Sequence, residues 1–229
     1  MYLVIKMKLI LHIGTEKTGT TSIQSFLKLN KTQLNKQNIF IPSSLFQLPS
    51  GNQRWITTFA LDEDTEDEFY NSIGSNVRDR KNLIRSKLNI FRKEVLENQK
   101  RTCIISSEHL SSRCEDIKTI SRSKTLLDKL FDDIFVLIYI RRPIDGATSS
   151  LSTAVKAGEI LKGLDLEFLT KHINNLKIIK LWEKVYTKDK LIIKLFDNNE
   201  FKNGNLIDDF CNVVNIKIKK SFVMPEKEN

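Results

Sequence analysis

Short apolar runs alternate with longer amphipathic stretches along this chain of 229 residues. The runs are rich in β-branched and aromatic residues, which is typical of strands that are buried on both faces. They cover residues 9–13, 38–41, 102–106, 134–140 and 191–196. Strands that alternate with helical stretches indicate a parallel sheet with helices on both faces. The pattern therefore predicts a three-layer α/β fold around a central parallel sheet of about five strands.

Helical spacing of apolar residues recurs between these runs. One predicted helix begins at Thr20, and a second follows the acidic block 62–68 and reaches to about Gln99. A third begins at Pro143, a fourth covers 165–187, and a fifth follows the turn from Asn203 to Asn205. Residues 157–165 are expected to form a loop beside a cleft, and loops in such places often carry specificity. The polar tail from about residue 217 is expected to fray.

The size and composition of the chain indicate how many domains it forms and in which compartment it is expected. At 26.6 kDa and 40% hydrophobic residues, the chain suits a single domain over residues 1–229. The first residues carry Lys6 and Lys8 and lead directly into a glycine loop, so we expect a first strand and not a signal peptide. No apolar run approaches the roughly 20 residues that cross a bilayer. Three cysteines without CxxC spacing argue against a metal site or a disulfide scaffold. We expect a cytoplasmic protein.

A formal net charge of +9 raises the question of an anionic partner. Much of this charge lies in scattered lysines of helices and of the tail, and no basic strand is interleaved with aromatic residues as in many RNA-binding domains. We therefore expect no nucleic-acid partner. Peripheral contact of a basic surface with a membrane remains open, and the oligomeric state is not encoded in any recognisable pattern.

The most informative segment is residues 8–22, in which an apolar run, a glycine loop and a helix start follow one another. Free backbone N–H groups and the positive end of a helix dipole meet in such a loop and form an anion site. The spacing from Gly14 to Gly19 is that of a P-loop, but Thr20 stands where the P-loop lysine belongs, and Lys17 lies inside the loop. The residues expected to touch the anion are Gly14, Thr15, Glu16, Lys17, Thr18, Gly19, Thr20 and Thr21. A glycine- and threonine-rich turn without a ligand is the alternative.

A second segment begins with the most apolar run, residues 134–140, and continues with Arg141, Arg142 and Pro143. Pro143 suits the first position of a helix. The planar guanidinium of Arg141 suits a phosphate, since it can donate two parallel hydrogen bonds. Two arginines that simply end a strand, with Asp145 as a surface partner, are the alternative.

A candidate base follows the predicted strand 102–106. Glu108 and His109 come directly after it, and open parallel sheets bind ligands beyond the carboxyl ends of their strands. If the chain stays extended there, the two side chains point to opposite sides and only one can face the cleft. A packed histidine with satisfied ring nitrogens is the alternative for His109. His12 and His172 are no better placed.

These segments together resemble sulfotransferases that use 3′-phosphoadenosine 5′-phosphosulfate (PAPS). Lys17-Thr18-Gly19-Thr20-Thr21 is similar to the family's 5′-phosphosulfate loop, and Arg141 and Ser149 match the arginine and serine of its 3′-phosphate motif. Glu108-His109-Leu110 is similar to the strand end that carries the histidine base of cytosolic members, whereas carbohydrate-acting branches use a glutamate. Arg142 departs mildly from the pattern, and the C-terminal Arg-Lys-Gly element of the cytosolic branch is absent.

The resemblance implies transfer of a sulfuryl group from PAPS to an acceptor hydroxyl, without a metal ion. His109 or Glu108 would take the acceptor proton, and Lys17 would stabilise the leaving phosphate. A glycan or glycolipid acceptor of bacterial type is the first expectation. Two alternatives remain: a P-loop kinase, which would want a lysine at position 20 and an acidic metal ligand at a strand end, and a nucleotide-binding module without catalysis. Asp132 and Asp133 precede their strand, which is the wrong end for that metal ligand.

Overall fold

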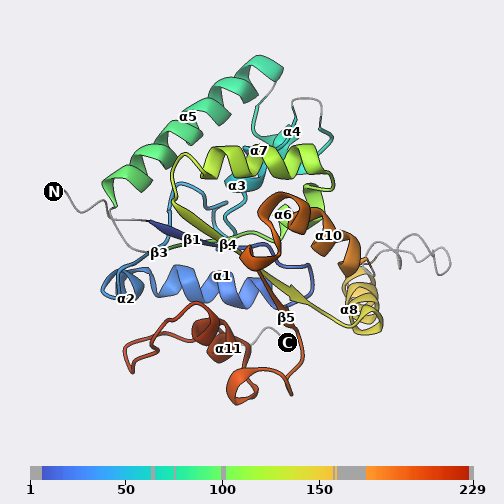
Figure 1. The fold of residues 1–229 in the computed structure, drawn as a ribbon. Coiled ribbons are helices and arrows are strands. Elements are labelled where there is room, and N and C mark those ends of the chain that lie inside the picture. The colour runs from blue at the N-terminus through green and yellow to red at the C-terminus, as the bar shows by residue number, and fades with distance from the viewer. Residues whose placement is uncertain are drawn as a thin grey trace.

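A parallel sheet of five strands forms the centre of the computed structural model, in the order β2-β3-β1-β4-β5 (Figure 1). The structure describes residues 7–62, 65–74, 76–98, 102–156, 158 and 174–226. The strands are β1 (Lys8–His12), β2 (Ile39–Phe40), β3 (Thr102–Ser106), β4 (Asp133–Ile140) and β5 (Leu191–Leu195). All neighbouring strands are parallel, so their carboxyl ends share one edge of the sheet. The predicted fold class is confirmed, although β2 is shorter than the apolar run 38–41.

Helices cover both faces of the sheet, because alternate strand residues point to opposite sides. Leu9, Leu11 and Ile105 pack into one apolar core together with helices above the sheet in Figure 1. Ile10, Ile104 and Leu137 pack into a second core together with the helices below it. The helices above are α3 (Trp55–Thr58), α5 (Val77–Glu97), α7 (Ile117–Leu127) and α10 (Asn175–Tyr186), and those below are α1 (Thr20–Leu29), α2 (Lys31–Asn35) and α11 (Leu206–Val213).

The remaining described elements are α4 (Glu68–Ser72), α6 (His109–Arg113), α8 (Pro143–Lys156), η1 (Lys188–Lys190) and η2 (Lys202–Gly204). Of these, α6 and α8 follow the carboxyl ends of β3 and β4. The helix that begins at Pro143 was predicted correctly. The helical stretch before Gln99 is divided into α4 and α5, because Asn76 caps the start of the second helix through the amide of Asp79.

The predicted single helix 165–187 is interrupted at Asn174, which is not helical. Helix α10 begins at Asn175, since the side chain of Asn174 accepts a hydrogen bond from the amide of Lys177 and so caps the first turn. The earlier part of that prediction, with His172, lies outside the described residues, as does the expected loop 157–165 apart from Gly158.

The expected fraying of the tail is wrong for its described part. The side-chain amide of Asn30 pairs with both backbone groups of Val223, and the ring of Phe222 stacks on Phe26 of α1 at 5.8 Å between centroids. The side chain of Gln37 holds the backbone of Lys217 in the same way. Apolar and polar contacts therefore fix residues that a polar composition alone suggests are loose.

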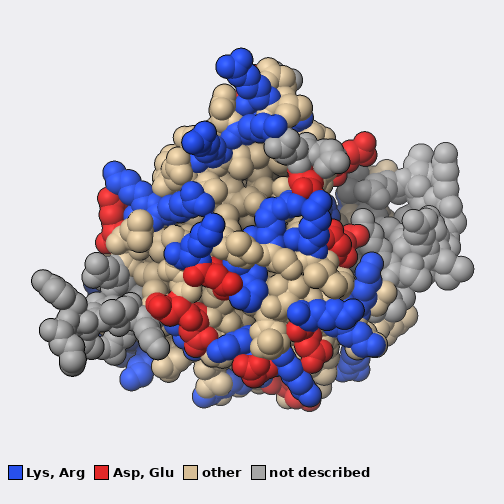
Figure 2. Space-filling model, turned by 45° about the horizontal axis from the view of Figure 1, so that its top comes forward, with Lys and Arg blue, Asp and Glu red and all other residues tan. Residues whose placement is uncertain are grey.

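Charge is mixed over the face of the molecule drawn in Figure 2, where acidic side chains lie between many lysines and arginines. In the part of the chain that the structure describes, no helix combines the length and the apolar character needed to cross a bilayer.

Candidate functional site

The loop after β1 has a backbone shape that its two glycines permit. Gly14 has a φ of +92° and Gly19 a φ of +68°, both in the region that side chains disfavour. An added Cβ at Gly19 would lie 2.3 Å from Cδ2 of Leu206, and one at Gly14 would lie 3.0 Å from Cβ of Glu108. The loop is thus pressed against α11 on one side and against the end of β3 on the other.

Several consecutive backbone amides of this loop have no hydrogen-bond partner in the described part of the chain. Among the described residues, none of the backbone N–H groups from Glu16 to Ser22 donates a hydrogen bond. This run includes the first turn of α1. The amide of Thr15 donates to the carbonyl of Tyr139, and the amide of Ile23 donates to the carbonyl of Gly19, so pairing stops and resumes at these two residues. We call the free N–H groups from Glu16 to Ser22 the cradle. Together with the positive end of α1, the cradle can bind an anion.

Lys17 crosses from the loop to helix α8. Its Nζ donates a hydrogen bond to Oγ1 of Thr153 at 3.0 Å, and its φ of 61° is left-handed. The hydroxyl of Thr18 is buried and donates to the carbonyl of Thr15, so it stabilises the loop from inside. Thr20 is buried, whereas Thr21 is exposed on the first turn of α1.

Arg141 lies at the end of β4 beside the same loop. Its guanidinium donates to the carbonyl of Lys17 at 3.1 Å and lies 5.3 Å above the ring of Phe196. Arg142 turns away and pairs with Asp197 and Asp145. No hydrogen bond joins Arg141 to Ser149 in the described part of the chain, and the carbonyl of Ser149 accepts from Thr153. The structure therefore brings Arg141 and Lys17 together directly, and links Ser149 to Lys17 through Thr153.

Glu108 does not continue the strand. Its φ of −65° and ψ of −21° turn the chain into α6, so the chain does not stay extended and the condition for opposed side chains of Glu108 and His109 is not met. Its carboxylate accepts hydrogen bonds from Nε2 of Gln24 and from Nδ2 of Asn52, the latter at 2.9 Å. Both carboxylate oxygens are thus held by amides.

The partners of Glu108 come from two elements that the end of β3 brings together. The segment before α3 runs along β3, since Gln53 pairs with both backbone groups of Ser106. Gly51 lets this segment approach α1, because a Cβ there would lie 2.7 Å from the carbonyl oxygen of Gln24. Sequence reasoning missed Gln24 and Asn52, which are far apart in the chain and belong to no motif.

His109 is the first residue of α6. Its Nε2 lies 4.0 Å from Oε1 of Glu108, and its Nδ1 is buried without a hydrogen-bond partner in the described part of the chain. Burial lowers the pKa of His109 below its usual value, and the charges of Arg54 and Arg113 lower this pKa further, whereas Glu108 and Glu16 raise it. The net effect is a neutral imidazole at neutral pH, which can accept a proton.

The other candidate titratable groups have structural partners. His12 is completely buried, and this burial lowers its pKa to about 3, so it remains neutral within the core. Asp132 accepts a hydrogen bond from the amide of Met7, and Asp133 pairs with Lys190. Both aspartates lie at the amino end of β4, away from the cradle.

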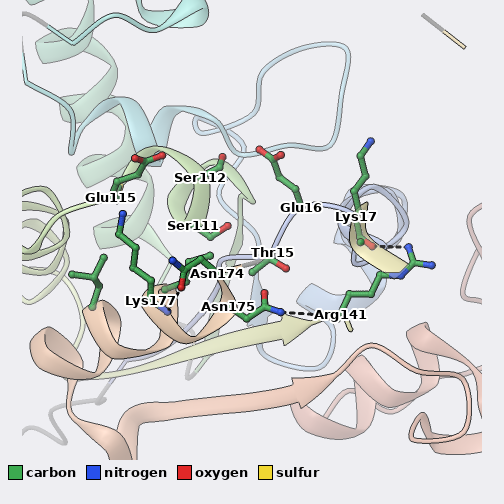
Figure 3. A pocket seen from close by; sticks show the side chains of 14 residues that line it. Thr15, Glu16, Lys17, Ser111, Ser112, Glu115, Arg141, Asn174, Asn175 and Lys177 are labelled. Carbon is green, nitrogen blue, oxygen red and sulfur yellow. Dashed lines mark hydrogen bonds between the residues drawn. The ribbon is translucent and has the colours of Figure 1, made fainter. Parts of the chain in front are cut away.

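A cavity of about 480 Å³ opens beside the loop (Figure 3). Its walls come from residues Thr15, Glu16 and Lys17 of the loop, from the end of α6 and the turn after it, from Arg141 and Gly146, and from the first two turns of α10. We call it the α6–α10 cavity. Neither Glu108 nor His109 is among the residues that line it, whereas the carboxylate of Glu16 is. The amide of Glu16 thus belongs to the cradle and its side chain to the cavity.

No protein-family model matches the sequence, and no curated protein matches it. The chain is similar in structure to a sulfotransferase from Alicyclobacillus acidocaldarius, with a TM-score of 0.53 and 16% identity over 96% of this chain and 85% of that one. It is also similar to the sulfotransferase domain from the curacin biosynthetic pathway, with a TM-score of 0.49 and 11% identity over 98% of this chain and 78% of that one. The sulfotransferase domain from the Synechococcus PCC 7002 olefin synthase has a TM-score of 0.48 and 11% identity over 97% of this chain and 78% of that one. The first similarity shows that the two chains share the α/β fold.

Proposed function

We propose that this protein is a sulfotransferase that moves a sulfuryl group from PAPS to an acceptor hydroxyl. The observation that carries the proposal is the cradle, an unbroken run of free amides at the positive end of a helix, with Lys17 and Arg141 beside it. Such an arrangement favours a ligand with several negative charges, and PAPS carries two phosphates and a sulfate. The fold shared with a sulfotransferase agrees with this function but does not by itself assign it.

Each group near the loop has a role in this proposal. The cradle and the hydroxyl of exposed Thr21 hold the 5′-phosphosulfate, while Lys17 exchanges its contact with Thr153 for one with the oxygen that joins phosphorus to sulfur. Arg141 and Ser149 hold the 3′-phosphate. Gly14, Thr15, Thr18, Gly19 and Thr20 give the loop its shape and hold nothing through their side chains. The metal-free mechanism expected from the sequence is retained.

His109 is the better candidate for the base. Glu108 has both carboxylate oxygens occupied by amide donors, whereas the neutral imidazole of His109 has a free nitrogen. In this arrangement Glu108 stabilises the imidazolium that forms when His109 is protonated, at 4.0 Å in the free enzyme. Gln24 and Asn52 keep that carboxylate in place.

The proposed step conserves atoms and charge. His109 accepts the proton of the acceptor hydroxyl as its oxygen forms a bond to sulfur, and the bond between sulfur and the bridging oxygen breaks on the opposite side. Lys17 and the cradle stabilise the negative charge that this oxygen gains on the departing 3′,5′-adenosine bisphosphate. The sulfated acceptor and the bisphosphate are the products.

A kinase finds less support in the same residues. The lysine that would reach β- and γ-phosphates is absent from position 20, and Asp132 and Asp133 are engaged at the amino end of β4. A single domain in a reducing, cytoplasmic compartment remains our proposal, since Cys103, Cys114 and Cys211 are all buried and free. Partners other than the donor and a glycan or other hydroxyl acceptor are not part of the proposal.

Transfer of radioactive sulfate from labelled PAPS to a panel of glycans, alcohols and phenols tests this function. We expect transfer that persists in EDTA and that an excess of ATP inhibits weakly. Phosphate transfer from ATP that EDTA abolishes would instead assign a kinase. Tight binding of the bisphosphate without transfer to any acceptor would assign a binding module.

A further inference from the structure

Three charged side chains face the α6–α10 cavity without a charged partner. The carboxylates of Glu16 and Glu115 and the ammonium of Lys177 line it, and none of them forms an ion pair with a described residue. In Figure 3, Lys177 extends from α10 toward the side of the cavity on which Glu115 lies, and Glu16 stands between Ser112 and Lys17. Apart from Lys17 and Arg141, which the proposed function assigns to the donor, the cavity thus carries two negative charges and one positive charge.

The rest of the lining is polar but not aromatic. Ser112, Asn174 and Asn175 offer hydroxyl and carboxamide groups, and Nδ2 of Asn175 already donates to the carbonyl of Arg141 at 2.9 Å. Ile178 and Leu181 add an aliphatic wall. No aromatic ring lines the cavity among the residues that the structure describes. A flat phenol finds no stacking partner among these described residues, and a long alkyl chain would leave their polar groups without partners.

The position of Glu16 relates this cavity to the reaction. Its amide is part of the cradle and its side chain is part of the cavity wall, so a molecule in the cavity lies next to whatever the cradle holds. His109 begins the short helix α6, and Ser111 and Ser112 of that helix line the cavity, so the cavity adjoins the helix that carries the proposed base. The two carboxylates make the cavity unsuitable for the donor's phosphates, because like charges repel.

We propose that the α6–α10 cavity binds the acceptor, and that this acceptor is a saturated polyhydroxyl compound without negative charge, of the class of neutral and amino sugars. This inference rests on the proposed function. Carboxylates accept hydrogen bonds from vicinal hydroxyls, and carboxamides both accept and donate them. Glu16 and Glu115 also attract an ammonium group and repel a carboxylate. Ile178 and Leu181 contact the C–H face of the ring. A volume of about 480 Å³ is within the usual range for a small-molecule site.

A matched series of acceptors tests this inference. The methyl glycosides of glucosamine, glucose and glucuronic acid share a ring and differ in charge, and 4-nitrophenol and 1-decanol represent the excluded classes. We expect kcat/KM to fall from the amino sugar to the neutral sugar and by about tenfold or more to the uronic acid, with the difference mainly in KM. Preference for the uronic acid, for 4-nitrophenol or for 1-decanol would overturn the inference.

Charge-neutral variants locate the effect in the cavity. Glu16→Gln and Glu115→Gln should each reduce the preference for the amino sugar over the uronic acid. Glu115 lies outside the cradle, so the affinity of Glu115→Gln for 3′,5′-adenosine bisphosphate should stay unchanged. Glu200→Gln, in an exposed turn far from the cavity in sequence, is the matched control and should alter neither quantity. An unchanged preference in both cavity variants would overturn the inference.

Binding of the bisphosphate separates the two proposals. A protein that binds the bisphosphate and sulfates a phenol contradicts only the acceptor class. A protein that binds no bisphosphate and transfers no sulfate contradicts the proposed function itself.

Discussion

The cradle and the α6–α10 cavity lie on either side of one loop and are built in different ways. The cradle comes from contiguous residues, Glu16 to Ser22, whose backbone N–H groups are the proposed anion donors and whose shape depends on Gly14 and Gly19. The cavity comes from side chains of the loop, of the turn after α6 and of α10, which are distant in sequence. A backbone site leaves a short motif in the sequence, whereas a side-chain site assembled by the fold does not. The sequence therefore indicated an anion loop, and suggested a glycan acceptor only through a family resemblance, whereas the lining of the cavity could be described only from the structure.

The largest effect is expected at His109, the proposed base, which belongs to neither the cradle nor the lining of the cavity. His109→Ala should reduce single-turnover sulfate transfer by about a hundred- to ten-thousandfold, because the proton acceptor is lost. Nucleotide affinity, measured by calorimetry on the same preparation, should survive. Glu108→Gln should cost less, since it removes only the charge that stabilises the imidazolium. An inactive Glu108→Gln beside a fully active His109→Ala would reverse the two roles.

The next effect belongs to the cradle side. Lys17→Ala should lower kcat by roughly a hundred- to a thousandfold, because a donor to the developing charge on the leaving phosphate is removed. Lys36→Ala, at the far end of α2, is the matched control for the loss of one surface charge and should leave kcat unchanged. Stopped-flow or quench measurement of a single turnover separates the rate of the chemical step from the rate of product release. A normal rate in Lys17→Ala would contradict the assignment of this lysine.

A smaller effect tests the shape of the cradle. Gly19→Ala should destabilise the protein by about 1–2 kcal/mol, since the residue has left-handed backbone angles. The new Cβ would also press on Leu206 at 2.3 Å. Adding Leu206→Ala relieves that contact but leaves the backbone cost, so chemical denaturation of the single and double variants separates the two causes. Equal stability of Gly19→Ala and the original protein would show that the loop conformation is different.

The smallest effect is a shift in pH dependence. The base must be neutral, so activity should be lost as the pH falls through a pKa below about 6.5, the ordinary value for histidine. Arg113 lowers the pKa of His109, and Glu108 raises it. Arg113→Gln should therefore move the acid limb of kcat/KM to higher pH, and Glu108→Gln should move it to lower pH. Shifts in the same direction would contradict His109 as the titrating group.

Most of the fold could be predicted because it depends on local patterns. All five strands were recognised from short apolar runs, and their parallel arrangement follows from the helices between them. Helix ends were less predictable, since the start of α10 depends on one capping side chain, Asn174, within a continuous apolar pattern. The placement of the segment around Phe222 depends on tertiary contacts, such as that of Phe222 with Phe26, which a polar composition conceals.

The candidate site was predictable on its backbone side alone. The loop and Arg141 were found through their spacing, and the structure places them in contact. The turn at Glu108 was missed because a strand end looks the same in sequence whether the chain continues or enters α6. Gln24, Asn52 and Lys177 were missed because each is an ordinary polar residue that only the fold brings to the site.

The claim that the loop and the end of β4 together bind a 3′-phosphorylated nucleotide has a direct test. Calorimetric titration with 3′,5′-adenosine bisphosphate and with 5′-AMP compares the original protein with Arg141→Ala. We predict that the variant binds the bisphosphate about ten- to a hundredfold more weakly, which corresponds to the loss of a charge-assisted contact, while its affinity for 5′-AMP changes little. Equal affinity of the original protein for both nucleotides, or equal weakening of both in Arg141→Ala, would contradict the account.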